Sequence, residues 1–155
     1  MDDEAFARAI IALTDTLYRV SYAQLHQRAD QEDAVQECLR RAWEKRHTLR
    51  EAKYLQTWLI RILINECHRI QGHMKRIAPQ DELPLSGRDQ PSYLRDAFVS
   101  VPEKYRMPML LHYIEGMSVA ETAQALRIPQ GTVKSRLARG RKALREILGE
   151  EVFEA

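Results

Sequence analysis

The fold of this 155-residue chain is decided most clearly by residues 118–142, which read SVAETAQALRIPQGTVKSRLARGRK. Ser118 and Glu121 have the spacing of a capping box, in which each side chain accepts a hydrogen bond from the backbone amide of the other residue. A short helix is therefore predicted to begin at Ser118 and to end at the break Arg127–Gly131, which contains Pro129. A second helix follows this break. Helix, tight turn and helix in this order indicate a helix-turn-helix.

The second helix of this motif has one apolar face and one basic face. The apolar face is predicted from residues at helical spacing, Val133, Leu137, Leu144 and Leu148. In the first helix, Ala123 matters because a bulky side chain there would push the two crossing helices apart. The outward face of the second helix carries seven polar or basic residues, Thr132, Lys134, Ser135, Arg136, Arg139, Arg141 and Lys142.

This outward face suits the major groove of DNA. In that groove Lys134, Ser135 and Arg139 could reach base edges, whereas Arg141 and Lys142 would lie nearer to phosphates. The alternative is a basic amphipathic helix that packs on a protein partner. Because the cap, the small crossing residue, the turn and the basic face all occur at workable offsets, we favour DNA binding over this alternative.

Charge is distributed unevenly along the chain, although the total is only +2. Residues 46–78 and residues 118–148 each hold seven Lys or Arg and two Glu, so each block carries a net charge of +5 and the remainder carries −8. Two basic blocks in an otherwise acidic chain indicate two contacts with a polyanion. Charge alone would favour solvated helix faces over such contacts.

Three helices are predicted in the first half of the chain from the spacing of apolar residues. They cover about residues 3–27, 30–47 and 55–76, and Asp30 is expected to cap the second one. The apolar faces include Trp43 and Trp58, which are therefore expected to be buried. Three helices with short connections predict a small helical bundle.

The second half of the chain begins after a segment without helical periodicity. Residues 77–90 contain two prolines and a glycine and are predicted to form a flexible linker. Pro91 is expected to open the next helix, and a further helix is expected over Glu103–Ile114, ended by Gly116 and kinked or split by Pro108. The predicted fold is all-α, with two small helical domains, residues 1–76 and 91–155, joined by the linker 77–90.

Several other classes of protein are disfavoured by the sequence. The longest apolar stretches are far shorter than the roughly 20 residues of a membrane span, so no membrane insertion is expected. The acidic start Met1–Glu4 is unlike a secretory signal and favours a cytoplasmic protein. Cys38 and Cys67 are too few for a disulfide framework or a four-cysteine zinc site and are expected to be reduced and packed.

Enzymatic chemistry finds little support among the residues. His68 and His73 are five residues apart and share no helix face with an acidic ligand at metal spacing. The chain has no glycine-rich loop that would cradle a phosphate, and no Ser or Cys stands near a His and a carboxylate in sequence. We therefore expect a protein that is not an enzyme and that uses no metal and no cofactor.

Five motifs in order resemble the sigma-70 family of bacterial RNA polymerase initiation factors, in the extracytoplasmic-function class that retains only regions 2 and 4. The motifs that resemble region 2 are Asp33–Glu37 with Ala42-Trp43, and Thr57–Ile62 with Asn65. Those that resemble region 4 are Val101–Arg106, Glu115–Ser118 and Gly131–Arg136. The chain departs from the family pattern at Leu49, Val101, Pro108 and Gly140. In the last helix, Gly140 replaces a usual alanine and should cost that helix roughly 1 kcal/mol.

The resemblance implies a dissociable subunit of core RNA polymerase that recognises the minus-10 and minus-35 elements of promoter DNA. It implies polymerase contacts by Asp33, Gln36, Glu37 and Arg40. For the minus-10 element it implies that Leu49, Arg50 and Asn65 read the opened strand and that His68, Arg69, Lys75 and Arg76 follow its backbone. Where the family often has an aromatic residue that stacks on a base, Leu49 can only cover one. An anti-sigma factor is a further partner implied by the resemblance.

A different class of protein remains as an alternative. A stand-alone helix-turn-helix regulator could use its first domain to sense a ligand or to dimerise, and it would bind a palindromic site as a symmetric dimer. A sigma factor would instead bind promoter DNA weakly by itself and direct transcription only together with core polymerase. Transcription with core enzyme therefore separates the two functions.

Overall fold

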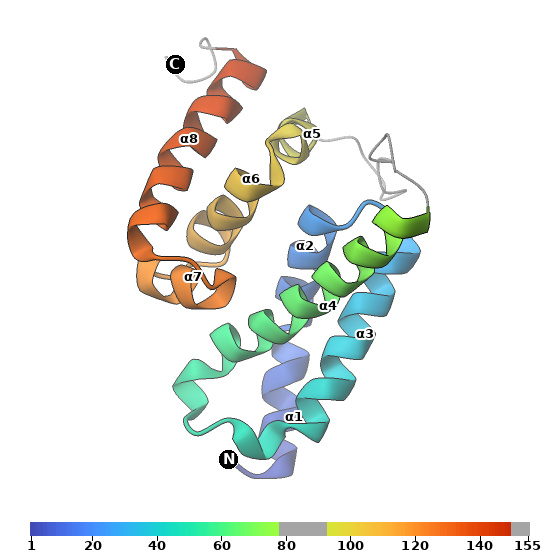
Figure 1. The fold of residues 1–155 in the computed structure, drawn as a ribbon. Helices are drawn as coiled ribbons and strands as arrows, with labels where there is room; N and C mark the ends of the chain where they lie inside the picture. The colour runs from blue at the N-terminus through green and yellow to red at the C-terminus, as the bar shows by residue number, and fades with distance from the viewer. Residues whose placement is uncertain (78–92, 150–155) are drawn as a thin grey trace. The chain divides into compact units, whose positions relative to one another are not determined.

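The computed structural model describes the backbone of residues 1–77 and 93–149 and the side chains of residues 1–73 and 95–149 (Figure 1). All regular secondary structure in these ranges is helical, which confirms the predicted all-α fold. The chain divides into two compact units, Met1–Pro84 and Leu85–Ala155, here called the N-terminal and the C-terminal unit. Most of the predicted linker, residues 78–90, lies outside the described residues.

The N-terminal unit is built from four α-helices. Its elements in chain order are α1 (Asp3–Ala12), α2 (Thr14–Gln24), α3 (Arg28–Glu44), the 3-10 turns η1 (Arg46–Thr48) and η2 (Ala52–Tyr54), and α4 (Leu55–Ile77). Helices α3 and α4 pack against each other, and α2 packs against both. The core lies between these three helices and includes the fully buried side chains of Leu17, Val35, Leu59 and Leu63.

The single helix predicted over residues 3–27 is wrong, because the chain forms α1 and α2 with a break at Leu13. At this break the Leu13 amide donates to the carbonyl of Ile10 at 3.0 Å. The Thr14 hydroxyl donates to the same carbonyl at 3.5 Å, so a side chain competes with the regular helical hydrogen bond. The apolar stripe continues through Leu13, which is why periodicity alone joined the two helices.

The boundaries of α3 also differ from those predicted. The helix begins at Arg28 rather than after Asp30, and its N-cap residue, Gln27, makes no side-chain capping bond. Asp30 therefore lies in the first turn of the helix. Its negative charge interacts favourably with the helix dipole there, but its side chain does not cap the helix end. The helix ends at Glu44, and His47 belongs to the separate turn η1.

The predicted burial of Trp43 is wrong, because this side chain is 42% exposed. Successive residues of a helix point about 100° apart, and the preceding residue, Ala42, takes the buried position. The Trp43 ring packs beside Phe6, with ring centroids 6.2 Å apart, and carries the Arg46 guanidinium 4.0 Å above it. Trp58 is half-buried and also contacts Phe6, edge-on, with ring centroids 6.0 Å apart.

Both cysteines are buried in the N-terminal unit as free thiols. The Cys38 thiol donates to the carbonyl of Leu59 at 3.6 Å and so helps to join α3 to α4. Burial, assisted by the negative charge of Glu66, raises the pKa of Cys38 to about 12. This thiol is a packing group, because the reactive thiolate form is suppressed.

The C-terminal unit arranges its helices around α8. Its elements are α5 (Tyr93–Ser100), α6 (Glu103–Met109), the π-helical turn η3 (Leu110–Ile114), α7 (Val119–Leu126) and α8 (Gln130–Leu148). Helix α8 packs on α5, α6 and α7. The core contains Val101, Met109, Ala123, Val133 and Leu137.

The split predicted at Pro108 is confirmed, because the segment Glu103–Ile114 divides into α6 and η3. Proline has no amide hydrogen to donate into the helix, and α6 ends one residue later, at Met109. The backbone then widens into η3, where the Glu115 amide reaches the carbonyl five residues earlier, at Leu110, over 3.0 Å. Gly116 follows with a φ of +74°, which ends the segment.

Gly140 has a packing role that the sequence did not indicate. A Cβ atom at this position would lie 2.4 Å from Sδ of Met109 and 3.3 Å from Cβ of Tyr105. The missing side chain therefore lets α8 approach α6 closely. Glycine lowers the helix propensity of α8 at this position, but it allows the close packing of α8 on α6.

No helix among the described residues has the length and apolar character needed to cross a bilayer.

Candidate nucleic-acid interface

The predicted helix-turn-helix is formed by α7 and α8. The Glu121 amide donates to the Ser118 hydroxyl and the Ser118 amide donates to the Glu121 carboxylate, both at 3.0 Å, so the capping box is confirmed. Arg127 ends α7 in the left-handed conformation, with φ +59°. The small side chain of Ala123 is buried where the two helices meet, as its position predicts.

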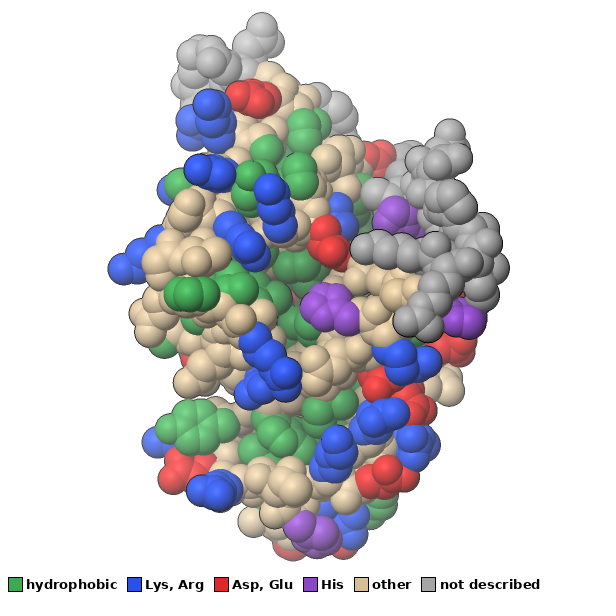
Figure 2. Space-filling view, in the orientation of Figure 1, with side chains coloured by type: hydrophobic (Ala, Val, Ile, Leu, Met, Phe, Trp, Pro, Cys, Tyr) green, Lys and Arg blue, Asp and Glu red, His purple; other side chains and the backbone are tan. Residues whose placement is uncertain are grey.

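The outward face of α8 is largely open to solvent. Five of the seven predicted residues are exposed, Lys134, Ser135, Arg139, Arg141 and Lys142, and two are half-buried, Thr132 and Arg136. Figure 2 shows several Lys and Arg side chains over the part of the molecule that Figure 1 labels α8. The structure therefore brings the seven residues onto one helix as predicted, with the cationic groups mostly in contact with water.

Two of these arginines lie beside tyrosines. The Arg141 guanidinium donates to the Tyr113 hydroxyl. Arg139 lines the same cavity as Tyr105, and its interaction with the Tyr105 hydroxyl, with help from Lys104, keeps the pKa of Tyr105 below its usual range. A tyrosine hydroxyl leaves the guanidinium its full positive charge, so both arginines remain able to attract a phosphate.

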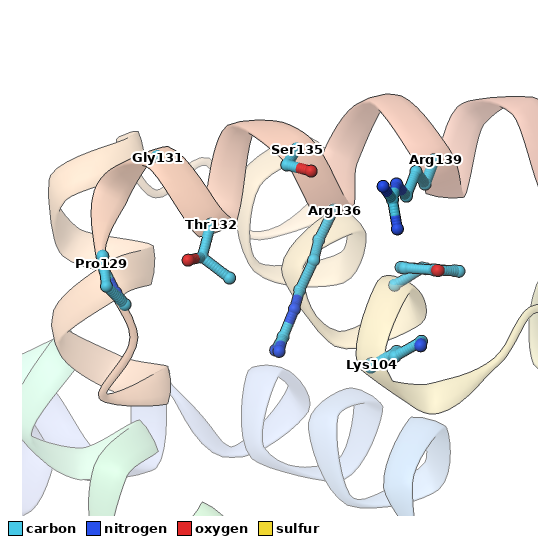
Figure 3. A pocket seen from close by; sticks show the side chains of 8 residues that line it. Lys104, Pro129, Gly131, Thr132, Ser135, Arg136 and Arg139 are labelled. Atoms are coloured by element: carbon cyan, nitrogen blue, oxygen red, sulfur yellow. The ribbon is translucent and has the colours of Figure 1, made fainter.

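A cavity of about 480 Å³ lies where α6 faces the first turns of α8 (Figure 3). It is lined by Lys104, Tyr105, Pro129, Gly131, Thr132, Ser135, Arg136 and Arg139. Lys104 and Tyr105 were not predicted from the sequence to be interface residues. They lie some 30 residues before the basic face in sequence, and only the packing of α6 on α8 brings them to it.

The residues expected at the minus-10 element fall into two groups. Asn65, His68 and Arg69 are exposed on α4 at spacings of three and one, which puts Asn65 and His68 on one helix face. Leu49, which is half-buried, and Arg50, which is exposed, lie between η1 and η2. Within residues 1–73, no hydrogen bond or ion pair joins these two to the three on α4.

The last two residues predicted for this element lie at the end of α4. The helix extends to Ile77, so the backbone of Lys75 and Arg76 is helical. Their side chains lie outside the described residues.

The residues expected to contact polymerase all lie on α3. Asp33, Gln36 and Arg40 are exposed, and Glu37 is half-buried. The Glu37 carboxylate accepts hydrogen bonds from Arg40 and, at 3.1 Å, from Arg41. Hydrogen bonding by Arg40, followed by the positive charges of Arg40 and Arg41, lowers the pKa of Glu37 to about 2.

An ion-pair network continues from this face into the contact between α3 and α4. Arg41 also bonds to the Glu66 carboxylate at 2.7 Å, and Arg69 bonds to the other oxygen of the same carboxylate at 3.0 Å. The Glu66 side chain is only 5% exposed, so both arginines are held by a buried charge. Sequence spacing could not indicate this pairing between Arg41 and Glu66, because the two residues are on different helices.

Comparisons with known proteins agree with the two-unit arrangement. The family described as Sigma-70 region 2 matches residues 6–76, and the family described as Sigma-70, region 4 matches residues 92–144. The ECF RNA polymerase sigma factor SigW of Bacillus subtilis is 29% identical over 95% of this chain and 90% of its own length. The ECF RNA polymerase sigma factor SigM of Mycobacterium tuberculosis is 31% identical over 87% of this chain and 76% of its own length.

A solved structure supports the same fold. The sigma factor RpoE of Bartonella quintana, solved in complex with the anti-sigma factor NepR, superposes with a TM-score of 0.79 at 22% sequence identity. The match covers 94% of this chain and 97% of that one. With regions 2 and 4 both matched, and SigM more than 30% identical over most of both chains, this chain belongs to the extracytoplasmic-function class of the sigma-70 family, the RNA polymerase subunits that direct promoter recognition and transcription initiation.

Proposed function

We propose that α8 of this sigma factor enters the major groove at the minus-35 element of its promoters. The observation that carries this proposal is the open basic face of a helix that is fixed on α7 by the turn between them. Lys134 and Ser135 are exposed near the start of α8 and would reach base edges. Arg141 and Lys142, two turns later, would contact phosphates.

For the minus-10 element we propose that α4 presents the reading surface. Asn65 can accept and donate hydrogen bonds to an unstacked base, and His68 follows one turn later on the same face. The charge of Arg69 is shared with Glu66, so this residue should contribute less to DNA binding than its sequence position implies. Leu49 and Arg50 complete the proposed surface, as do Lys75 and Arg76 at the end of α4.

The proposed contact with core polymerase is the face of α3 that carries Asp33, Gln36, Glu37 and Arg40. A partner would meet an ordered ion pair here, because Arg40 and Arg41 hold the Glu37 carboxylate. Glu37→Lys should weaken the capture of core enzyme without unfolding the protein. Glu32→Lys is the matched control, since Glu32 is exposed on the same helix and pairs with Arg28. Equal capture by both variants would remove Glu37 from the contact.

Run-off transcription tests the whole proposal. Purified chain and core polymerase should initiate at a promoter, and changes in either the upstream or the downstream element should reduce the product. A stand-alone dimeric regulator would bind a palindromic duplex without core enzyme and would not support initiation. Failure to initiate on any promoter, with tight binding to a palindrome, would establish that alternative.

Three further properties follow from the proposed role. The chemistry of RNA synthesis belongs to the polymerase, so the chain needs no catalytic residue and no cofactor of its own. Promoter DNA and polymerase are in the bacterial cytoplasm, so we place the protein there. The RpoE structure contains the anti-sigma factor NepR, and we propose that this chain is likewise regulated by an anti-sigma factor.

A further inference from the structure

The cavity between α6 and α8 has the chemistry of an anion site. Lys104 comes from α6, whereas Arg136 and Arg139 come from α8, and all three line the same cavity. The hydroxyls of Thr132 and Ser135 add two donors, and no Asp or Glu is among the lining residues. Cationic groups and hydroxyls in this combination bind oxygen atoms that carry negative charge.

Figure 3 shows how these side chains are directed. Arg139 extends from α8 toward α6, Lys104 lies opposite it, and Arg136 extends from the same side of α8. Tyr105 lines the cavity together with Arg139, and the Lys104 ammonium lies 5.0 Å from the centre of the Tyr105 ring. A tyrosine on α6 is therefore placed at the cavity with one cation from its own helix and one from α8.

The charges at this cavity are not neutralised inside the protein. Across the side chains that the structure describes, no ion pair joins Lys104, Arg136 or Arg139 to a carboxylate. Like charges held close together repel one another, and an anion placed between them removes this cost. The cavity is thus prepared for an anion that the protein itself does not supply.

We infer that this cavity binds a phosphate of the DNA backbone beside the minus-35 element. The inference rests on the proposed docking of α8, because Ser135 belongs both to the cavity and to the proposed base-reading face. About 480 Å³ is more room than a lone phosphate needs, and it suits a phosphate with parts of its neighbouring sugars. Backbone contacts of this kind set the register of a protein on DNA without reading sequence.

This inference changes two assignments. Lys104 becomes a DNA-contacting residue on α6, outside the helix-turn-helix. Arg139, whose sequence position favours base reading, becomes a phosphate ligand, with the Tyr105 hydroxyl beside it in the cavity lining. Lys134 and Ser135 are left as the base-reading pair.

The test compares the full-length chain with its Lys104→Ala variant. Binding to two fluorescent duplexes is measured by anisotropy over a range of salt concentrations. One duplex carries an upstream element defined by run-off transcription, and the other has the same composition in scrambled order. Lys104→Ala should weaken both duplexes by the same factor and reduce the slope of log affinity against log salt by about 1. Lys45→Ala, which removes an exposed lysine of the N-terminal unit, should leave both unchanged.

Two further variants separate charge from position. Lys104→Arg keeps the charge at the cavity and should restore both the affinity and the salt slope. Tyr105→Phe keeps all the cations but removes a hydroxyl from the cavity lining, so it should weaken both duplexes while the salt slope stays as in the wild type. A role of Tyr105 in folding alone would lower thermal stability and leave the affinity of the folded protein unchanged.

The outcomes distinguish this inference from the proposed function. Wild-type binding with no effect of Lys104→Ala, or a loss confined to the specific duplex, would overturn the phosphate assignment alone. Absence of salt-dependent binding by the wild type would overturn the docking of α8 as well. Exchange of chloride for inorganic phosphate at equal ionic strength should leave the melting temperature unchanged. A rise in the melting temperature that Lys104→Ala abolishes would identify the cavity as a site for free anions instead.

Discussion

Helices α4 and α8 invite comparison because the sequence segments around them carry the same net charge of +5. In the structure the two helices differ in how many of their residues are buried. Nine described residues of α4 are buried, including Leu59, Leu63 and the charged Glu66, whereas α8 buries four. Helix α4 therefore contributes mainly to the core of its unit, whereas α8 exposes most of its residues to solvent.

The two helices also differ in where their positive charges are directed. On α4, Arg69 is paired with the buried Glu66, which also holds Arg41 of α3. On α8, Arg141 is hydrogen-bonded to the Tyr113 hydroxyl, Arg139 lies beside Tyr105 in the cavity lining, and both arginines keep their full charge. The two segments have equal net charge in sequence but differ in the positive charge that is available to bind a ligand. The reason is that one buried carboxylate can neutralise cations from two helices.

The largest expected effect tests the burial side of this comparison. Leu63→Ala should lower the free energy of unfolding of the N-terminal unit by about 2–5 kcal/mol, because this side chain of α4 is fully buried. Trp43→Ala should cost only about 1–2 kcal/mol, since the indole is partly exposed and loses its contacts with Phe6 and with the Arg46 guanidinium. Urea unfolding followed by circular dichroism measures both. Equal losses would show that Trp43 stabilises the unit as strongly as a core residue does.

A second prediction tests the pairing of charges. Glu66→Gln keeps the shape of the side chain but removes the charge that Arg41 and Arg69 share, so it should cost about 1.5–3 kcal/mol in urea unfolding. Lys134→Ala on α8 removes a charge without such a partner and should stay within about 0.5 kcal/mol of the wild type. If both changes were equally harmless, the contrast between paired and open charges would be wrong.

Local signals explain which parts of the fold were predictable. The capping box of α7 needs only Ser118 and Glu121, and both hydrogen bonds form as predicted. The division of the helix expected over Glu103–Ile114 was predictable from Pro108, whereas the π-helical form of η3 was not. The break at Leu13 was missed because its cause is a hydroxyl at Thr14, which leaves the apolar periodicity intact.

The candidate site also has one part that could be predicted from the sequence and one part that could not. The basic face of α8 was predictable because helical spacing alone puts Lys134, Ser135 and Arg139 on the outside. The cavity was not, because Lys104 reaches Arg139 only after α6 has packed on α8. Features that depend on two elements meeting in space leave no periodic pattern in the sequence.

A third prediction sharpens the comparison at the glycines of the two helices. Gly140→Ala would push a Cβ atom into Met109, and overpacking of this kind costs about 1–3 kcal/mol. The gain of helix propensity offsets up to about 1 kcal/mol, so a net loss of about 1–2 kcal/mol is expected. Gly72→Ala on α4 meets no atom within 4 Å and should stabilise by about 0.5–1 kcal/mol. Thermal unfolding checks the opposite signs, and stabilisation by both would mean that α6 and α8 are not so close.

The smallest expected effect tests the ion pairs of α3 by acid. The pKa of Glu37 is lowered to about 2, mainly by its hydrogen bond to Arg40, so the folded protein binds this proton more weakly than the unfolded chain does. The stabilisation is therefore complete above about pH 4.5 and is lost as the pH falls toward 2. Glu37→Gln should flatten the dependence of melting temperature on pH between about pH 4.5 and pH 2. Near neutrality the melting temperature of the variant should depend on pH as that of the wild type does. Arg40→Met should flatten the same part of the curve, and the double variant should add little to Glu37→Gln there, because the Glu37–Arg40 pair is common to both changes. The Arg40–Glu44 pair is lost in the single Arg40→Met variant and in the double variant alike. Additive effects would mean that Glu37 owes its low pKa to Arg41 rather than to Arg40, and the network that joins α3 to Glu66 on α4 would then begin one residue later.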